Sequence, residues 1–208
     1  ITAIMFPLIT SLVWLFDEIP PVWIITIATL LLDVKFLFFF RAIEGFGNYF
    51  AILIGVAKKV VAFLVVLGLI VFAFAHSLHI LLRPTSEYSY DQPNYTDDVN
   101  NPWNLVSTYQ SVSSNGSIES TSLIETPDAN TNLFAVFSTA IIAVYFMLTG
   151  DTSSVTPWVW KDNWTLVFLL MIFSFFTTIY LMNLFIGLLN MAIEITNNDE
   201  SFLALRGE

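Results

Sequence analysis

The sequence predicts an all-α polytopic membrane protein, and two observations support that prediction. Of the 208 residues 56% are hydrophobic and only 12% are charged, whereas about 25% of the residues of a soluble domain are charged. The segments from Val60 to Leu82 and from Asn163 to Ile193 contain no Asp, Glu, Lys or Arg. Each is long enough to cross a hydrocarbon core of ~30 Å as a helix, and backbone polar groups in that core must bond within their own segment.

Three further apolar stretches differ from these two in length or in charge. Residues 1–16 are expected to be part of a truncated span. Residues 22–40 follow Pro20-Pro21, a pair that ends one helix and allows another to start, and they are expected to span the membrane. The stretch 132–148 is too short to cross and runs into Thr149-Gly150-Asp151, so we expect it to be re-entrant. Non-helical backbone at membrane depth must be buried in protein or line a wet cavity, and a closed ring of identical chains meets that requirement.

Charged residues predict which side of the membrane each connection faces. Short cytoplasmic segments carry an excess of Lys and Arg, and Arg41, Lys58, Lys59 and Arg206 adjoin the ends assigned to that side. The opposite side holds an acidic segment, residues 83–131, which is expected to be a long outer loop with little core of its own. Its acidic residues are Glu87, Asp91, Asp97, Asp98, Glu119, Glu125 and Asp128. The N-x-[ST] acceptors Asn94 and Asn115 fall on the same side and are glycosylation candidates.

Asp33 and Lys35 lie inside the expected span 22–40, where ionisable groups need partners or water. One interpretation is an ion pair, or hydrogen bonds to other helices. The other is a pocket for a ligand or a bound lipid between helices. One Lys and one Arg over residues 22–41 are too few for a voltage-sensing helix, so strong voltage dependence is not expected.

Composition excludes several classes of function. The absence of Cys excludes disulfides, thiol catalysis and zinc-thiolate sites. Seventeen acidic residues against seven basic ones, a formal net charge of −10 with no basic stripe, argue against nucleic acid as a partner. His76 and His79 lie one helical turn apart near the outer end of the span 60–82, and both a structural role and the sensing of external protons remain open for them. No cofactor is expected.

One enzyme class shares a motif with this chain. Intramembrane aspartyl proteases pair a Tyr-Asp motif with a Gly-x-Gly-Asp motif, and the chain contains Tyr90-Asp91 and Gly150-Asp151. Catalysis by two carboxylates requires both on facing helices at membrane depth. Tyr90-Asp91 lies among Ser, Gln, Pro and Asn in the outer loop, and Leu148 stands where the first Gly belongs. This class is therefore a remote alternative, and the sequence predicts no enzyme.

Three motifs occur in an informative order and spacing. They are Phe36-Leu37-Phe38-Phe39-Phe40-Arg41-Ala42 followed by Phe46-Gly47 and Lys58-Lys59, then Met147-Leu148-Thr149-Gly150-Asp151, then Asn183-Leu184-Phe185-Ile186-Gly187-Leu188-Leu189-Asn190. In this order they resemble the fourth helix and its linker, the short selectivity filter, and the gate segment of the sixth helix in transient receptor potential (TRP) cation channels. The resemblance is strongest to the vanilloid-type and related ankyrin-bearing branches, and it covers residues 22–194 apart from the outer loop.

The resemblance implies a partial six-helix channel fold, from the end of the third helix through the sixth, that forms one quarter of a fourfold pore. The expected segments are a truncated third helix (1–16), the fourth helix (17–42), a cytoplasmic linker (43–57), the fifth helix (58–82), the acidic outer loop (83–131), the pore helix and filter (132–151), an outer pore loop (152–162), the pore-lining sixth helix (163–193) and a cytoplasmic end (194–208).

Under this resemblance, Leu148, Thr149, Gly150 and Asp151 form the ion-conducting filter. Rings of carbonyl and carboxylate oxygens can replace the hydration shell of a cation, and Gly tolerates the dihedral angles that turn a carbonyl inward. Four copies of Asp151 would concentrate negative charge and could bind a divalent cation such as calcium. The plainer alternative is that these residues are only a helix C-terminal turn. A potassium-type Thr-Val-Gly-Tyr-Gly filter is absent.

Asn183, Ile186 and Asn190 share one face of the last helix, because they recur at i, i+3 and i+7. Polar amides should avoid lipid, so this face is expected to turn to the pore, with Ile186 as an apolar gate that closes by dewetting. The alternative is that both amides join helix to helix. Gly187 is either a hinge beside the gate or a small-residue packing contact.

These interpretations predict the pore-forming subunit of a homotetrameric, non-selective, calcium-permeable cation channel. Its partners are membrane lipids and permeating cations such as Ca²⁺ and Na⁺, and no nucleic acid. The alternative from another class is a non-conducting membrane receptor or scaffold whose acidic loop binds an outside partner. The glycosylation signals favour a multi-pass protein of the plasma membrane, with a vacuolar or endolysosomal membrane as the second choice.

Overall fold

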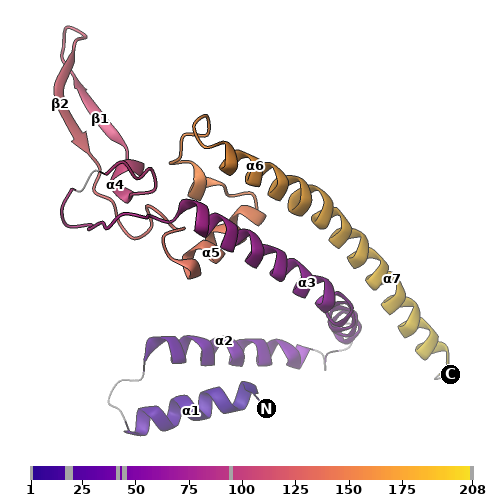
Figure 1. Cartoon of the computed structure of the whole chain (residues 1–208). Helices are drawn as coiled ribbons and strands as arrows, with labels where there is room; N and C mark the ends of the chain where they lie inside the picture. Colours follow the sequence, from indigo (N-terminus) through magenta and orange to yellow (C-terminus); the bar gives the residue numbers. More distant parts are fainter. Residues whose placement is uncertain (1, 17–20, 41–42, 44–45, 94–95, 207–208) are drawn as a thin grey trace. The chain divides into compact units, whose positions relative to one another are not determined.

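The computed structural model describes residues 2–16, 21–40, 43, 46–93 and 96–206, with side chains described for 5–16, 21–40, 43, 46–47, 49–50, 52–93, 96–118 and 122–195. The chain forms two compact units, the first made of Ile1–Val61 with Leu188–Glu208 and the second of Ala62–Gly187. Figure 1 shows that the described residues are mostly helical.

Three helices among the described residues are long and apolar enough to cross a membrane: Val22–Phe39, Ile52–Leu82 and Trp164–Ile195. Two shorter apolar helices, Met5–Phe16 and Phe137–Leu148, occupy the stretches expected to be truncated and re-entrant. The predicted all-α membrane class is therefore confirmed, and one β-hairpin in the outer segment was not expected.

In the first unit, α1 (Thr2–Phe16) and α2 (Val22–Phe39) lie against each other. Pro21 precedes α2 in an extended conformation, as expected where Pro lacks a donor and fixes φ at a helix start. Most side chains of α2 face outward, and Ala28 is its buried residue. An apolar surface of this kind is stable in lipid and would not be in water.

Helix α3 (Phe46–Leu82) is one continuous helix, which differs from the expected segments 43–57 and 58–82. The sequence places the end of the apolar span at Lys58 and Lys59, but Lys is a good helix former and does not interrupt helical hydrogen bonding. The helix therefore includes most of the expected linker. Its first turns contact α2 through the ring pair Phe38–Phe50 and the C-cap residue of α2 through the ring pair Phe40–Phe46, with centroids 6.4 and 6.1 Å apart.

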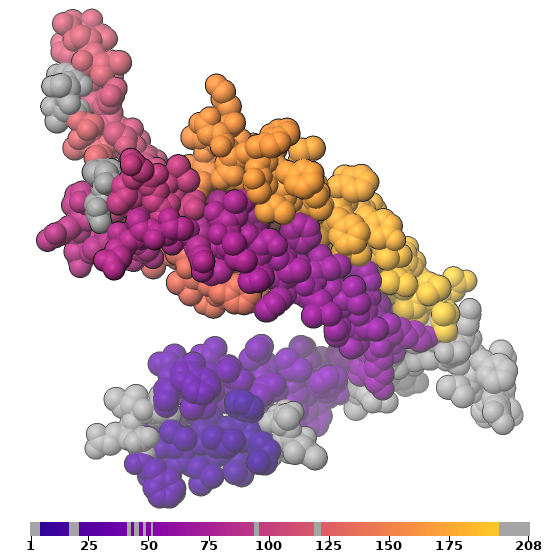
Figure 2. All heavy atoms as spheres, in the orientation of Figure 1, coloured from indigo at the N-terminus to yellow at the C-terminus, as the bar shows by residue number. Residues whose placement is uncertain are grey.

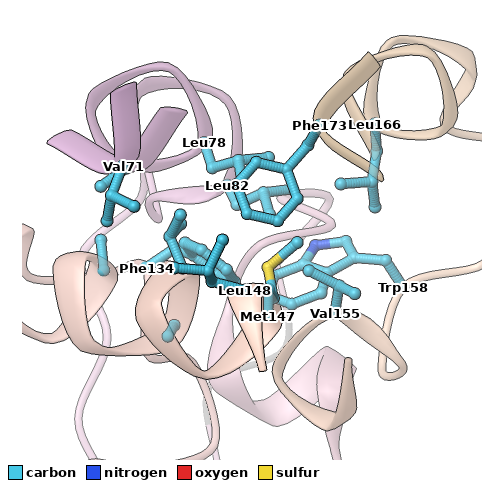
Figure 3. Packing of buried hydrophobic residues seen from close by; sticks show 14 residues of the cluster. Val71, Leu78, Leu82, Phe134, Met147, Leu148, Val155, Trp158, Leu166 and Phe173 are labelled. Atoms are coloured by element: carbon cyan, nitrogen blue, oxygen red, sulfur yellow. The ribbon is translucent and has the colours of Figure 1, made fainter. Parts of the chain in front are cut away.

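The core of the second unit lies where α3, α5 (Phe137–Leu148) and α6 (Trp164–Phe173) meet (Figure 3). Helix α3 contributes Ala75, Leu78 and Leu82 at helical spacing, and all three are buried. Phe134 lies just before α5 and is fully buried. The ring of Trp158 packs edge-on against the Phe134 ring, with the two ring centroids 5.9 Å apart. This core fixes both ends of the segment that contains Thr149-Gly150-Asp151.

The outer segment has a packed base, contrary to the expectation of little core. The short helix α4 (Pro102–Leu105) buries Trp103 at 7% exposure, and the Asn101 side chain caps its start by accepting from the Trp103 N–H. Beyond α4, strands β1 (Thr108–Val112) and β2 (Ile118–Ile124) pair antiparallel in a hairpin (Figure 1). The pink atoms of this segment protrude from the rest of the second unit (Figure 2). Every residue of β1 is exposed, so the prediction of little core holds for the hairpin alone.

The last helical stretch consists of α6, a π-helical segment η3 (Ser174–Leu181) and α7 (Met182–Arg206). It extends past the expected end at Ile193 because nothing in residues 194–206 breaks a helix. The π segment leaves the backbone Met182 N–H bonded to the Thr177 carbonyl five residues earlier, a spacing that often marks functional sites inside helices.

Candidate functional site

The turn after α5 is built around Gly150. The helix ends at Leu148, Thr149 stays near helical angles, and Gly150 adopts φ +99°, a conformation that favours glycine. The Gly150 N–H donates to the Met147 carbonyl at 3.1 Å and the Asp151 N–H to the Phe146 carbonyl at 3.1 Å, which is the Schellman pattern of a helix end. A Cβ at Gly150 would meet no atom within 4 Å, so backbone conformation and not space requires glycine here.

The carbonyl groups of this turn divide into two sets. Those of Phe146 and Met147 accept the capping hydrogen bonds, and the Thr149 hydroxyl also donates to the Phe146 carbonyl at 2.7 Å. Within the described part of the chain, the carbonyl oxygens of residues 148–150 accept no hydrogen bond. The side chain of Leu148 belongs to the core, so only its backbone is available as a ligand. The turn thus satisfies the geometry of a plain helix end and still offers three consecutive acceptors.

Asp151 presents an exposed carboxylate next to these acceptors. Its Oδ1 accepts a hydrogen bond from the Ser153 N–H at 2.9 Å. Hydrogen bonds from Ser153 hold the pKa of the Asp151 carboxyl below its ordinary value, because they favour the charged form. Asp151 is therefore an anion at neutral pH in this chain.

The expected gate residues lie on α7. Asn183 and Ile186 are exposed in the second unit, with Ile186 56% exposed. Asn190 is exposed farther along the same helix, in the first unit. The Asn183 side chain donates a hydrogen bond to the carbonyl of Ile179, a residue of the π segment. The Asn183 amide therefore bonds to the backbone of the preceding helical turn. A Cβ at Gly187 would meet no atom within 4 Å, which shows that no described neighbour requires a glycine there.

Comparison with known families assigns the chain to a class of proteins. The model of the ion transport protein family matches residues 2–201. The chain belongs to this family. It is the pore-forming transmembrane region of an ion channel and not an enzyme, which removes the aspartyl protease alternative. No curated protein and no solved structure matched the chain.

The channel has one histidine with a clear structural role. His79 Nδ1 lies 2.7 Å from the carbonyl oxygen of Phe134, and both His76 and His79 contact the ring of Phe137 edge-on. The His79 bond joins α3 to the segment that leads into α5. This favours the structural interpretation of His79 over proton sensing.

Several polar groups of the channel were not singled out from the sequence. Asn100 and Asn132 are 8% and 1% exposed. Their hydrogen-bond partners lie up to 58 residues away in the sequence, so no local sequence pattern predicts that these two side chains are buried and bonded. Asp98 is the one polar residue here with a local signal, an Asp before a turn. Burial alone would raise the pKa of Asp98, but backbone hydrogen bonds from Ser86, Asn100 and Thr85 outweigh it and lower the pKa to about 2.

Asn94, one of the two glycosylation candidates, lies outside the described part of the channel. Arg41 of the inner basic group, Pro20 of the predicted helix break and Ala42 of the first motif also lie outside it. Asn115 is described and exposed, at the turn between β1 and β2. Its Oδ1 accepts from the N–H and the hydroxyl of Ser117 at 3.1 and 2.6 Å.

Proposed function

We propose that this chain is one subunit of a tetrameric, TRP-like, non-selective cation channel that conducts calcium as well as sodium. The observation that carries the proposal is the turn 148–151, which combines three unpaired carbonyl oxygens with one ionised carboxylate. Oxygen groups of these two kinds replace the hydration shell of a permeating cation. Divalent cations prefer clusters of hard oxygen ligands, which supports calcium as a permeant ion and Asp151 as its ligand.

Fourfold assembly is part of the proposal because one turn cannot enclose a wet path. Among the described residues, no three His, Asp or Glu side chains gather as a metal site. A ring of four Asp151 carboxylates around an axis would create the local concentration of charge that a divalent ion needs. Repulsion within the ring would raise their pKa values, and the hydrogen bonds from Ser153 counteract this.

The inner gate is assigned to α7. We infer that Ile186 forms the apolar constriction and that Asn183 and Asn190 lie on the same face, above and below it. Gly187 is assigned as the hinge, because no described atom lies within 4 Å of a Cβ built there and a packing contact therefore does not account for the glycine. Narrow apolar constrictions close by dewetting and need no bulky plug.

The test of the proposal is cation flux through purified protein in liposomes. We expect calcium and sodium entry above that of protein-free liposomes, and a large organic cation such as N-methyl-D-glucamine should enter far more slowly. Subunit counting by single-molecule photobleaching should give four. Absence of cation flux under every applied stimulus would support a non-conducting receptor instead, and a monomer would refute the fourfold filter.

N-glycosylation at Asn115 provides a test of sidedness. The sequon Asn115-Gly116-Ser117 occupies an exposed hairpin turn, and modification occurs only on the side that faces the secretory lumen. In eukaryotic cells we expect Asn115→Gln to remove one glycosidase-sensitive shift in gel mobility. Ser117→Ala should remove the same shift and Ser114→Ala should not. An Asn115→Gln protein that migrates like the wild type would contradict the assignment and leave the plasma membrane prediction without this support.

A further inference from the structure

Helix α3 ends inside the protein, where its last carbonyl groups need partners. The final turn of a helix leaves its carbonyl oxygens without intrahelical donors. Here two asparagine side chains supply the donors. Asn100 Nδ2 donates to the carbonyls of Leu81 at 3.1 Å and Arg83 at 3.2 Å, and Asn132 Nδ2 donates to that of Leu82 at 2.9 Å.

Asn132 connects this helix end to the start of the pore-helix segment. Its Nδ2 also donates to the Asn100 backbone carbonyl at 2.9 Å, and its Oδ1 accepts from the Phe134 N–H at 3.0 Å. The Phe134 carbonyl in turn lies 2.7 Å from His79 Nδ1. Phe134 precedes α5 by three residues, so the entry to α5 is fixed to α3 from two sides.

Asn100 connects the same helix end to the chain beyond the turn. Its Oδ1 accepts a hydrogen bond from Trp158 Nε1 at 2.9 Å, and the Trp158 ring packs against Phe134. Trp158 is 4% exposed and follows Asp151 by seven residues. Figure 3 shows Phe134, Met147, Val155 and Trp158 in one cluster. The turn 149–151 is therefore held before and after by residues that bond to Asn100, Trp158 to its side-chain Oδ1 and Asn132 to its backbone carbonyl.

We propose that Asn100, although it belongs to the outer segment, is a positioning residue for the ion-conducting turn, acting through Trp158 on one side and Asn132 on the other. The inference rests on the proposed function of the turn as a filter. It assigns the outer segment a role that a solvated cover would not have. Asp98 supports the arrangement, because its Oδ1 accepts from the Asn100 N–H at 2.9 Å and so fixes the backbone of Asn100.

Amides suit this role because of their geometry. Each side chain carries both donors and an acceptor, so one buried Asn can fix three chain segments at defined distances. Apolar side chains would pack the same space without specifying the register of the segments. A buried amide left without hydrogen-bond partners raises the free energy of the folded state. The hydrogen bonds of Asn100 and Asn132 are therefore expected to form together or not at all.

The decisive variant is Trp158→Phe, which removes the Nε1 donor and keeps an aromatic ring against Phe134. We expect the amide protons of Gly150 and Asp151 to exchange with solvent about tenfold faster in this variant, although both amides donate to carbonyls of α5 and not to Trp158. We also expect a shift in the reversal potential measured with calcium outside and sodium inside. Trp164→Phe is the matched control, because Trp164 is 78% exposed at the start of α6, and it should change neither quantity.

Asn100→Ala tests the same bond from the other partner, and it keeps the proposal falsifiable if Trp158→Phe does not yield folded protein. The double variant should exchange no faster at Gly150 and Asp151 than Asn100→Ala alone, because the hydrogen bond that Trp158→Phe removes is one of the three that Asn100→Ala already breaks. Wild-type exchange at these two amides in either folded variant would overturn the proposal. Absence of cation flux in the wild type would instead refute the proposed function, since the exchange measurement does not depend on conduction.

Discussion

Replacing Asp151 by Asn should lower the calcium permeability of the channel relative to sodium by roughly tenfold. The substitution keeps the size of the side chain and removes one negative charge per subunit, and therefore four from the proposed ring. A divalent cation loses twice the electrostatic stabilisation that a monovalent one loses, so calcium entry should fall while sodium current persists. The measurement is the reversal potential under bi-ionic conditions, together with block of sodium current by external calcium.

Two variants separate the charge of Asp151 from general effects on the outer mouth. Asp151→Glu keeps the charge and should preserve calcium entry. Asp162→Asn removes an equally exposed carboxylate in the segment before α6 and should leave the permeability ratio unchanged. If Asp151→Asn had the wild-type permeability ratio and the wild-type calcium block, Asp151 would have no part in selectivity.

The sequence predicts the membrane helices well because their signal is local. The segments 60–82 and 163–193 lack charge over their whole length, and both correspond to helices in the structure. The glycine of the turn was also predictable, since an apolar stretch too short to span ends at Leu148, two residues before Gly150, and Gly150 has the positive φ that glycine allows.

The features that the sequence did not predict depend on distant partners or on backbone hydrogen bonding. The π segment 174–181 is an apolar run that looks like any other membrane helix, and no residue type marks it. The pairing of Asn100 with Trp158 joins positions 58 residues apart. The sequence does not predict the helical start of α3 at Phe46, because Lys58 and Lys59 mark a boundary of its apolar part and not of the helix.

The π segment bears directly on the gate, because it ends before the gate residues begin. From Met182 onward the helix is regular, so each residue advances by about 100°. Asn183, Ile186 and Asn190 then lie within an arc of about 60°. An extension of the π segment through this region would have moved Ile186 off that face.

Replacing Ile186 by Ser should therefore produce a channel that conducts without a stimulus. In the proposed tetramer the change removes an apolar side chain from each of four subunits at the proposed constriction and adds a hydroxyl that holds water there. Because an apolar constriction is closed by the absence of water, a hydrated one should leak cations at rest. We expect the resting cation current to rise by at least about tenfold, measured in whole cells or as flux into liposomes without an agonist.

Leu184→Ser is the matched control for this result. Leu184 is 41% exposed, against 56% for Ile186, but it lies two positions earlier, about 200° around the helix. The same loss of apolar surface on the opposite face should destabilise packing or lipid contact without wetting the pore. A resting current in Leu184→Ser and none in Ile186→Ser would place the pore on the other face of α7, whereas equal currents in both would show that the leak reflects a weakened helix and no gate at Ile186.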